Sequence, residues 1–166
     1  GMGRTGTLWR CDAEGIVPDI MTFGKAFGGG VMPITGLIFR PEMWSEELVE
    51  NPYLLGSTTF GGNPVCCAGA INVLNRLDEN MLAGVEERSA YIKRELTGAK
   101  GVLGVSGLGL MIGIQTEKNA SDIIAACREK GVLVIKAKDK LRLLPALNIP
   151  MEQLKKAVAV IKACCA

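Results

Sequence analysis

The first part of the chain alternates short apolar runs with glycine and proline. One run, with Ile20, Met21 and Phe23, follows Asp19, and a second run at residues 34–39 is rich in β-branched side chains. Short apolar runs bounded by turn residues predict buried strands. We therefore expect buried strands at residues 19–23 and 34–39. Proline suits the first turn of a helix, so a helix is expected from Pro41 through about residue 48.

The middle of the chain carries apolar positions at helical spacing. Asn63 is a favourable N-cap and Pro64 a favourable first helical residue, which predicts a helix from Pro64 to about residue 77. Asp78 is expected to cap a second, long helix that ends before Gly98. The positions of this second helix that should face inward are Met81, Leu82, Val85, Ile92 and Leu96.

After about residue 101 the pattern changes to short strands that alternate with helices. We expect strands at residues 102–105, 108–115, 132–135 and 141–144, and helices at residues 119–130 and 151–165. These elements predict a small α+β domain whose sheet is covered by two helices on one side. The long helix before them would bridge two domains, residues 1–97 and residues 98–166.

Composition excludes several classes of protein. With 166 residues, 48% hydrophobic and 22% charged, the chain should bury a core. A net charge of +2 offers no electrostatic case for nucleic acid binding. No apolar stretch approaches the ~20 residues of a membrane helix, and no secretory signal is expected. We therefore expect a cytoplasmic protein.

Cysteine and histidine usage narrows the possible chemistry. The six cysteines include two adjacent pairs, which is not a disulfide or zinc spacing, so reduced thiols and no metal site are expected. The absence of histidine excludes a Ser-His-Asp triad and a Cys-His dyad within this chain. Any acid–base catalysis by this chain would therefore use Lys, Asp, Glu, Cys or Tyr side chains.

One lysine lies between the first apolar run and three consecutive glycines. The stretch from Pro18 to Gly30 reads PDIMTFGKAFGGG, with Lys25 at the exit of the expected strand. Partial withdrawal from water would favour the neutral amine, which can condense with an aldehyde. A lysine beside a glycine-rich turn is more often a solvated loop residue, so both interpretations stay open from the residues alone. The order of residues is neither a Walker A loop nor a dinucleotide fingerprint.

Two further places carry candidate polar chemistry. Ser57, Thr58 and Thr59 precede glycines and Asn63, and such a turn can offer hydroxyl and backbone N–H groups to a phosphate. The alternative is a turn that only caps the next helix. Arg4, in a loop between glycines, could bind an anion or have a structural role.

Three motifs occur in order along the chain. They are GMGRTG at residues 1–6, PDIMTFGKAFGGGVMPI at residues 18–34 and STTFGGNP at residues 57–64. Together they resemble the class III aminotransferases, which depend on pyridoxal 5'-phosphate (PLP). VMPI after the glycines and NPYL at residues 51–54 look most like the putrescine/acetylornithine branch of the family.

The resemblance implies a fold class and a division into domains. The fold would be α/β, with residues 1–97 as the C-terminal portion of a fold-type I PLP-binding large domain, including the bridging helix. Residues 98–166 would be the small α+β C-terminal domain that closes over the active site. In the family about half of the protein lies upstream and holds most of the cofactor.

The resemblance also implies roles for individual residues. Lys25 would be the catalytic residue and would hold PLP covalently. Thr59 would reach the phosphate of the partner's PLP across a homodimer interface. Thr58 and Arg142 would contact substrate. Ser106 stands where the family often has an arginine, and we expect no role for it.

The expected activity of the complete protein is transfer of an amino group from a terminal amine, such as putrescine, another diamine, an ornithine derivative or another ω-amino acid, to a 2-oxo acid. Three alternatives remain from the sequence: an incomplete, non-catalytic fragment, an aminomutase or racemase on the same scaffold, and a phosphate-binding module built on residues 57–63. For these 166 residues alone we expect little or no activity.

Overall fold

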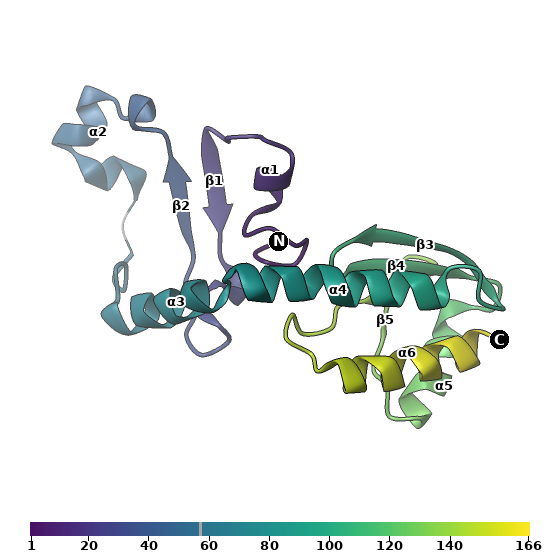
Figure 1. Ribbon diagram of the computed structural model, residues 1–166. Coiled ribbons are helices and arrows are strands. Elements are labelled where there is room, and N and C mark those ends of the chain that lie inside the picture. The colour runs from purple at the N-terminus through teal and green to yellow at the C-terminus, as the bar shows by residue number, and fades with distance from the viewer. Residues whose placement is uncertain (57) are drawn as a thin grey trace. The chain divides into compact units, whose positions relative to one another are not determined.

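The computed structural model describes residues 1–56 and 58–166, which form two compact units (Figure 1). The N-terminal unit is Cys11–Asp78, together with Met2. The C-terminal unit is Glu79–Ala166, together with Gly1 and Gly3–Arg10. None of the described helices has the length and apolar character needed to cross a membrane.

The N-terminal unit is built from one β-ribbon and several short helices. Strands β1 (Ile20–Phe23) and β2 (Gly36–Phe39) pair antiparallel, and the 3₁₀ helix η1 (Lys25–Gly28) follows β1. Helix α3 (Pro64–Arg76) packs against η1. The remaining helices are α1 (Arg10–Ala13), η2 (Pro41–Met43), α2 (Glu46–Glu50) and η3 (Pro52–Leu55).

Both predicted strands exist, but the expectation that they are buried is wrong for this chain. Ile20 is 54% exposed, and Leu37 and Ile38 are 52% and 55% exposed. Within the described residues β1 and β2 pair only with each other, so the ribbon leaves apolar side chains on both faces in solvent.

The single helix expected from Pro41 is also wrong. The structure has the 3₁₀ turn η2 and then α2, separated by Trp44 and Ser45. Ser45 starts α2 because its hydroxyl accepts a hydrogen bond from the backbone N–H of Leu48 at 3.2 Å. The predicted start of α3 is confirmed, since the side-chain oxygen of Asn63 accepts from the N–H groups of Val65 and Cys66.

The C-terminal unit has an antiparallel sheet of order β3-β4-β6-β5. Its strands are β3 (Val102–Leu108), β4 (Met111–Thr116), β5 (Ile135–Ala137) and β6 (Lys140–Leu143), and its helices are α4 (Glu79–Leu96), α5 (Ala120–Glu129) and α6 (Met151–Cys165). The predicted bounds of α6 are confirmed.

Two strand predictions in this unit are wrong in their bounds. The chain turns at Gly109 and Leu110 rather than between residues 105 and 108, because Gly107 stays in the ladder opposite Ile112. The segment after α5 becomes a strand only at Ile135, because the N–H of Val132 still bonds the carbonyl of Cys127 in the helix end, at 2.9 Å.

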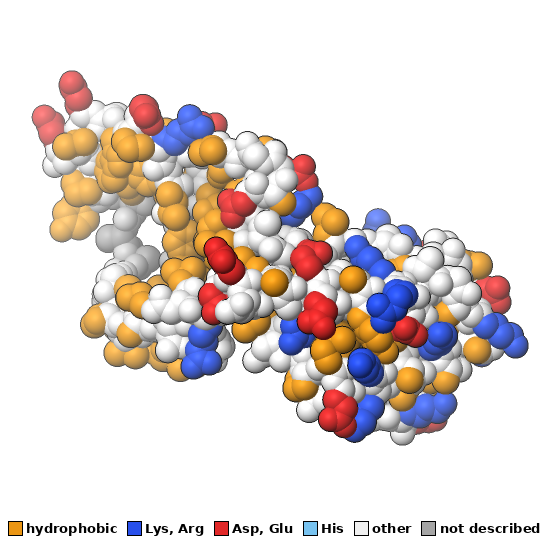
Figure 2. Space-filling view, in the orientation of Figure 1, with side chains coloured by type: hydrophobic (Ala, Val, Ile, Leu, Met, Phe, Trp, Pro, Cys, Tyr) orange, Lys and Arg blue, Asp and Glu red, His pale blue; other side chains and the backbone are white. Residues whose placement is uncertain are grey.

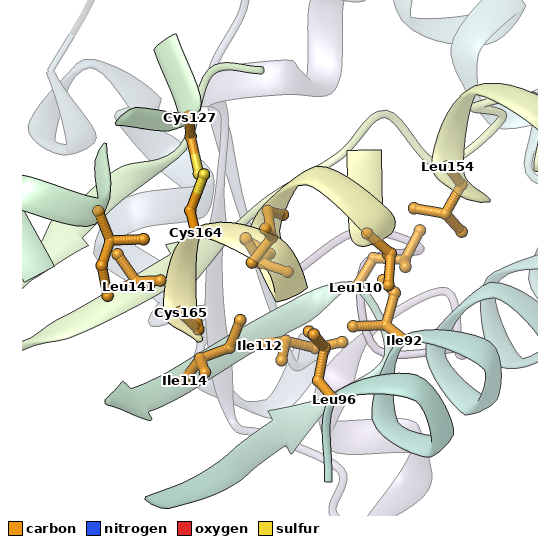
Figure 3. Close-up of a cluster of buried hydrophobic side chains, with 14 of the residues drawn as sticks. Ile92, Leu96, Leu110, Ile112, Ile114, Cys127, Leu141, Leu154, Cys164 and Cys165 are labelled. Atoms are coloured by element: carbon orange, nitrogen blue, oxygen red, sulfur yellow. The ribbon is translucent and has the colours of Figure 1, made fainter. Parts of the chain in front are cut away.

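Three helices, rather than the two expected, bury the sheet. The core takes Ile112 and Ile114 from β4 and Leu141 and Leu143 from β6, which alternate with residues on the opposite face. Figure 3 shows these strands facing α4 and α6. The helices contribute Val85, Ile92 and Leu96 from α4, Ile123 and Cys127 from α5, and Leu154, Val158, Ile161, Cys164 and Cys165 from α6.

Helix α4 therefore packs in the same compact unit as the C-terminal sheet. Its inward-facing residues Val85, Ile92 and Leu96 are fully buried, as their spacing predicts. The boundary between residues 97 and 98 stays a prediction about the domains of the complete protein.

The segment Gly3–Arg10 belongs to the C-terminal unit through Arg4. The Arg4 guanidinium donates to the carbonyl oxygens of Leu110, at 3.3 Å, and Pro145. The Arg4 carbonyl in turn accepts from the N–H of Leu110 at 2.9 Å. Burial lowers the pKa of Arg4, because desolvation disfavours its charge. Of the two interpretations of Arg4, these contacts favour the structural one.

Candidate functional site

Lys25 follows β1 directly and begins η1. Its backbone φ is 58°, in the left-handed region, which costs a residue with a Cβ of order 1–3 kcal/mol. Such strain persists only where the surrounding structure imposes it, and it is concentrated at functional sites. The side chain is exposed, so the expectation that it is withdrawn from water is wrong for this chain.

Two aromatic rings flank this lysine in the sequence. Phe23 and Phe27 have ring centroids 4.6 Å apart and an interplanar angle of 57°. Phe23 lies opposite Gly36 in the ribbon, and its ring covers that glycine so closely that a Cβ there would lie 2.5 Å from the ring. Because Gly36 has no side chain, the Phe23 ring fits over it and packs against Phe27 in a tilted arrangement.

The glycine cluster after Lys25 serves a tight turn against α3. Gly29 and Gly30 have φ of 67° and 76°, a conformation that favours glycine. A Cβ on Gly29 would lie 2.7 Å from a methyl carbon of Val73 in α3. The glycines therefore let the backbone of this turn approach a helix of the same unit closely.

The hydroxyl-rich turn leads into the capped end of α3. Ser57 lies outside the described residues, and Thr58 and Thr59 are exposed. The N–H of Gly61 donates to the Thr58 carbonyl at 3.0 Å, which closes the turn. Asn63 already accepts from the first N–H groups of α3, so any anion at this turn would be bound by the threonine hydroxyls rather than by those groups.

Arg142 lies in β6, on the sheet face opposite the helices. Its neighbours Leu141 and Leu143 point into the core, so strand alternation places Arg142 on the other face. Across the ladder it pairs with Gly113, which pairs in turn with Ser106. The Ser106 hydroxyl donates to the Gly113 carbonyl at 3.5 Å. Gly113 has no side chain. Ser106 and Arg142 therefore lie on either side of it, in one row across the sheet face opposite the helices.

The structure distributes the predicted residues over both units. Lys25, Thr58 and Thr59 belong to the N-terminal unit, and Arg142 belongs to the C-terminal unit. The sequence analysis did not predict the Phe23–Phe27 pair or the alignment of Ser106 with Arg142 across Gly113. The alignment of Ser106 with Arg142 depends on strand register, which the sequence of one short strand does not encode.

A cavity of about 530 Å³ lies in the C-terminal unit but holds none of these residues. Apolar side chains from α6 and from the segments on either side of β5 and β6 line it, including Val132, Leu144 and Val160. Among the described residues no three Cys, Asp or Glu side chains gather as a metal site would require.

Comparison with known proteins places the chain in a family. The family model described as aminotransferase class-III matches residues 1–165. An acetylornithine aminotransferase of Haemophilus ducreyi is 37% identical over 163 residues, which are 97% of this chain and 40% of the relative. A putrescine aminotransferase of Pectobacterium atrosepticum is 34% identical over 183 residues, in a match that covers 98% of this chain and 37% of the relative.

A solved structure agrees with these matches. The acetylornithine aminotransferase from Elizabethkingia anophelis has a TM-score of 0.83 and 28% identity, and the match covers 99% of this chain and 43% of that one. The chain thus spans about two fifths of the length of the curated relatives it matches. The mixed α/β fold predicted from the resemblance is confirmed. On these matches, the chain belongs to the class III aminotransferase family.

Proposed function

We propose that the complete protein transfers an amino group from a terminal amine to a 2-oxo acid with PLP as cofactor. Putrescine or another diamine or ω-amino acid is the proposed donor. The observation that carries this proposal is Lys25, a primary amine on a left-handed backbone turn at the exit of β1, within the family motif. The family relatives include both acetylornithine and putrescine aminotransferases.

The donor groups of the N-terminal unit suit PLP. Lys25 offers an exposed primary amine for the aldehyde, and Thr58 and Thr59 offer exposed hydroxyls for the phosphate. We assign Lys25 and Thr59 to cofactor binding, with Thr59 acting on the cofactor of a homodimer partner. The contacts to the cofactor ring would come from the upstream part of the family fold.

Bound PLP supplies an electron sink for the carbon that bears the substrate nitrogen. The Nζ atom of Lys25 would hold the cofactor. When free, the Lys25 amine would take the proton from the substrate carbon next to the nitrogen as general base and would return it as general acid. Lys25 thereby carries the proton in both directions.

Thr58 and Arg142 are the proposed substrate contacts. The Arg142 guanidinium can bind a carboxylate with two parallel hydrogen bonds, which suits an ω-amino acid or the 2-oxo acid. A diamine has no carboxylate, so Arg142 would then serve only the 2-oxo acid. Replacing Arg142 by Lys should therefore raise KM for the oxo acid more than KM for putrescine.

The decisive test uses Lys25→Ala and Lys100→Ala in the complete protein. Lys100 is an exposed lysine of the C-terminal unit and serves as the control. Borohydride reduction with PLP, followed by peptide mass spectrometry, should label Lys25 in the wild type and in the Lys100 variant. Transamination should fall by at least about 10³-fold in the Lys25 variant, since it loses both the covalent link and the proton carrier. Labelling of another lysine at full activity would refute the assignment.

The alternative reactions are separated by product analysis. A transaminase consumes one 2-oxo acid for each carbonyl product, whereas a racemase or aminomutase consumes none. The isolated 166-residue chain should show little or no turnover, because it spans about two fifths of its relatives.

A further inference from the structure

Three buried cysteines of the C-terminal unit have no part in the proposed reaction. Cys127 lies in α5, and Cys164 and Cys165 end α6; their exposed fractions are 0%, 8% and 1%. Figure 2 shows charged side chains spread over the visible face of this unit, and the thiols lie in the core beneath its surface. In the part of the chain that the structure describes, they complete no group that could hold a metal ion. Metal binding therefore gives no role to these thiols.

Cys127 and Cys164 face each other where α5 packs against α6. Figure 3 shows their two sulfur atoms pointing toward one another. A hydrogen bond joins the two thiols, and both cysteines are free. Two thiols that already touch need little movement of the backbone to reach the geometry of a disulfide. The fold has thus brought together two cysteines that lie far apart in the chain.

Cys165 is a natural control, because it is as buried as Cys127 but faces elsewhere. Successive residues of a helix point about 100° apart, so the side chains of Cys164 and Cys165 leave α6 in different directions. Figure 3 shows Cys165 apart from the two facing sulfurs, near Ile114 of the sheet. Of the two neighbours in α6, Cys164 is therefore the partner of Cys127.

We propose that Cys127 and Cys164 form a redox-active thiol pair, which a small disulfide such as oxidised glutathione converts into one intramolecular disulfide between α5 and α6. The thiolate of Cys164, the more exposed of the two, attacks the oxidant, forms a mixed disulfide and releases one glutathione. The thiolate of Cys127 then attacks the Cys164 sulfur and releases the second glutathione. In total the two protein thiols lose two electrons and two protons, which convert one oxidised glutathione into two reduced molecules.

Burial makes this reaction slow without opposing its outcome. Desolvation and the hydrogen bond to Cys164 raise the pKa of Cys127, and only the thiolate form of a cysteine is a nucleophile. The second step is therefore the slow one, and brief exposure to an oxidant leaves the pair reduced. Under sustained exposure the contact between the sulfurs favours the internal disulfide over a lasting mixed disulfide, because Cys127 is already beside the sulfur that it attacks.

The disulfide would stabilise the C-terminal unit. Strands β5 and β6 both lie between the two cysteines in the chain, so the bond closes a long loop that includes them. A cross-link that closes a long loop restricts the unfolded chain, which raises the stability of the folded one. For a unit of this size we expect Tm to rise by at least about 8 °C on oxidation.

The experiment uses the 166-residue chain, which is fully reduced and then incubated with an excess of oxidised glutathione. Free thiols are alkylated, and the protein is digested with trypsin without reductant. Mass spectrometry should find the peptide of Cys127 joined to the peptide of Cys164. Thermal unfolding followed by circular dichroism should show the higher Tm, and dithiothreitol should restore the lower one.

Single variants assign the bond, since Cys164 and Cys165 lie in the same tryptic peptide. Cys127→Ala and Cys164→Ala should each abolish the joined peptides and the rise in Tm, whereas Cys165→Ala should keep both. Free cysteine packs as a small apolar residue, so alanine is the conservative replacement. The Tm of each reduced variant reports whether it is folded, and the peptide map of the wild type needs no variant.

Two results would overturn the proposal. One is that Cys127 and Cys164 stay unlinked in the wild type under conditions in which the half-buried Cys66 carries glutathione, because the oxidant would then be active and the pair inert. The other is that the joined peptides persist in Cys164→Ala and disappear in Cys165→Ala, because Cys165 would then be the partner of Cys127.

Discussion

Replacing Arg4 by Met tests whether this residue binds the C-terminal sheet or an anion. Methionine keeps an apolar stem of similar length and removes the guanidinium. Two carbonyl acceptors, of Leu110 and Pro145, lose a charged donor. Each such hydrogen bond contributes about 1.5–3 kcal/mol.

The opposing effect is the desolvation of the guanidinium, which is also the cause of its lowered pKa. Removing the charge recovers that cost, so we expect a net loss of about 1–3 kcal/mol rather than the sum of two bonds. For a unit of about 100 residues this lowers Tm by roughly 4–20 °C.

The assay is thermal unfolding of the 166-residue chain, followed by circular dichroism with and without inorganic phosphate. The structural role predicts the drop in Tm for Arg4→Met and no effect of phosphate on either protein. An unchanged Tm in the variant would refute the reasoning, as would a phosphate-dependent rise in the wild type that the variant lacks.

Three further predictions concern packing, pH and helix capping. Ile112→Ala should lower the free energy of unfolding by about 2–5 kcal/mol in urea titrations, because it empties a fully buried site, whereas Met111→Ala at a 41% exposed position should cost far less. Burial and the neighbouring Cys164 raise the pKa of Cys127 to about 12. The folded state therefore keeps a proton that the unfolded chain loses, so stability should fall as pH rises above about 9, by up to about 1.4 kcal/mol per pH unit, and Cys127→Ala should reduce this slope. Asn63→Ala should cost about 1 kcal/mol by removing the cap of α3, measured as faster amide exchange at Val65 and Cys66; unchanged exchange would contradict the capping role.

Several elements of this protein could be predicted from local sequence. The bounds of α6 follow from its apolar spacing, and the start of α3 follows from Asn63 and Pro64. Both depend on interactions within a few residues, which a sequence displays directly. The same holds for the burial of Val85, Ile92 and Leu96 in α4.

Other features could not be predicted because they depend on which segments meet. The break between η2 and α2 arises from the competing cap at Ser45, and the turn at Gly109 coincides with the hydrogen bond of Leu110 to Arg4, more than 100 residues away in the chain. The third helix on the sheet was missed because α4 was interpreted only as a bridge.

By itself the sequence determined the family, through three motifs in order, and the identity of Lys25 as the candidate amine, because motif residues are read one by one along the chain. Only the tertiary structure decided that Lys25 is strained and exposed, that Phe23 lies over Gly36, and that Ser106 and Arg142 share a row across Gly113. Exposure and cross-strand neighbours are set by strand pairing and by what covers each face, and neither is encoded within a single segment.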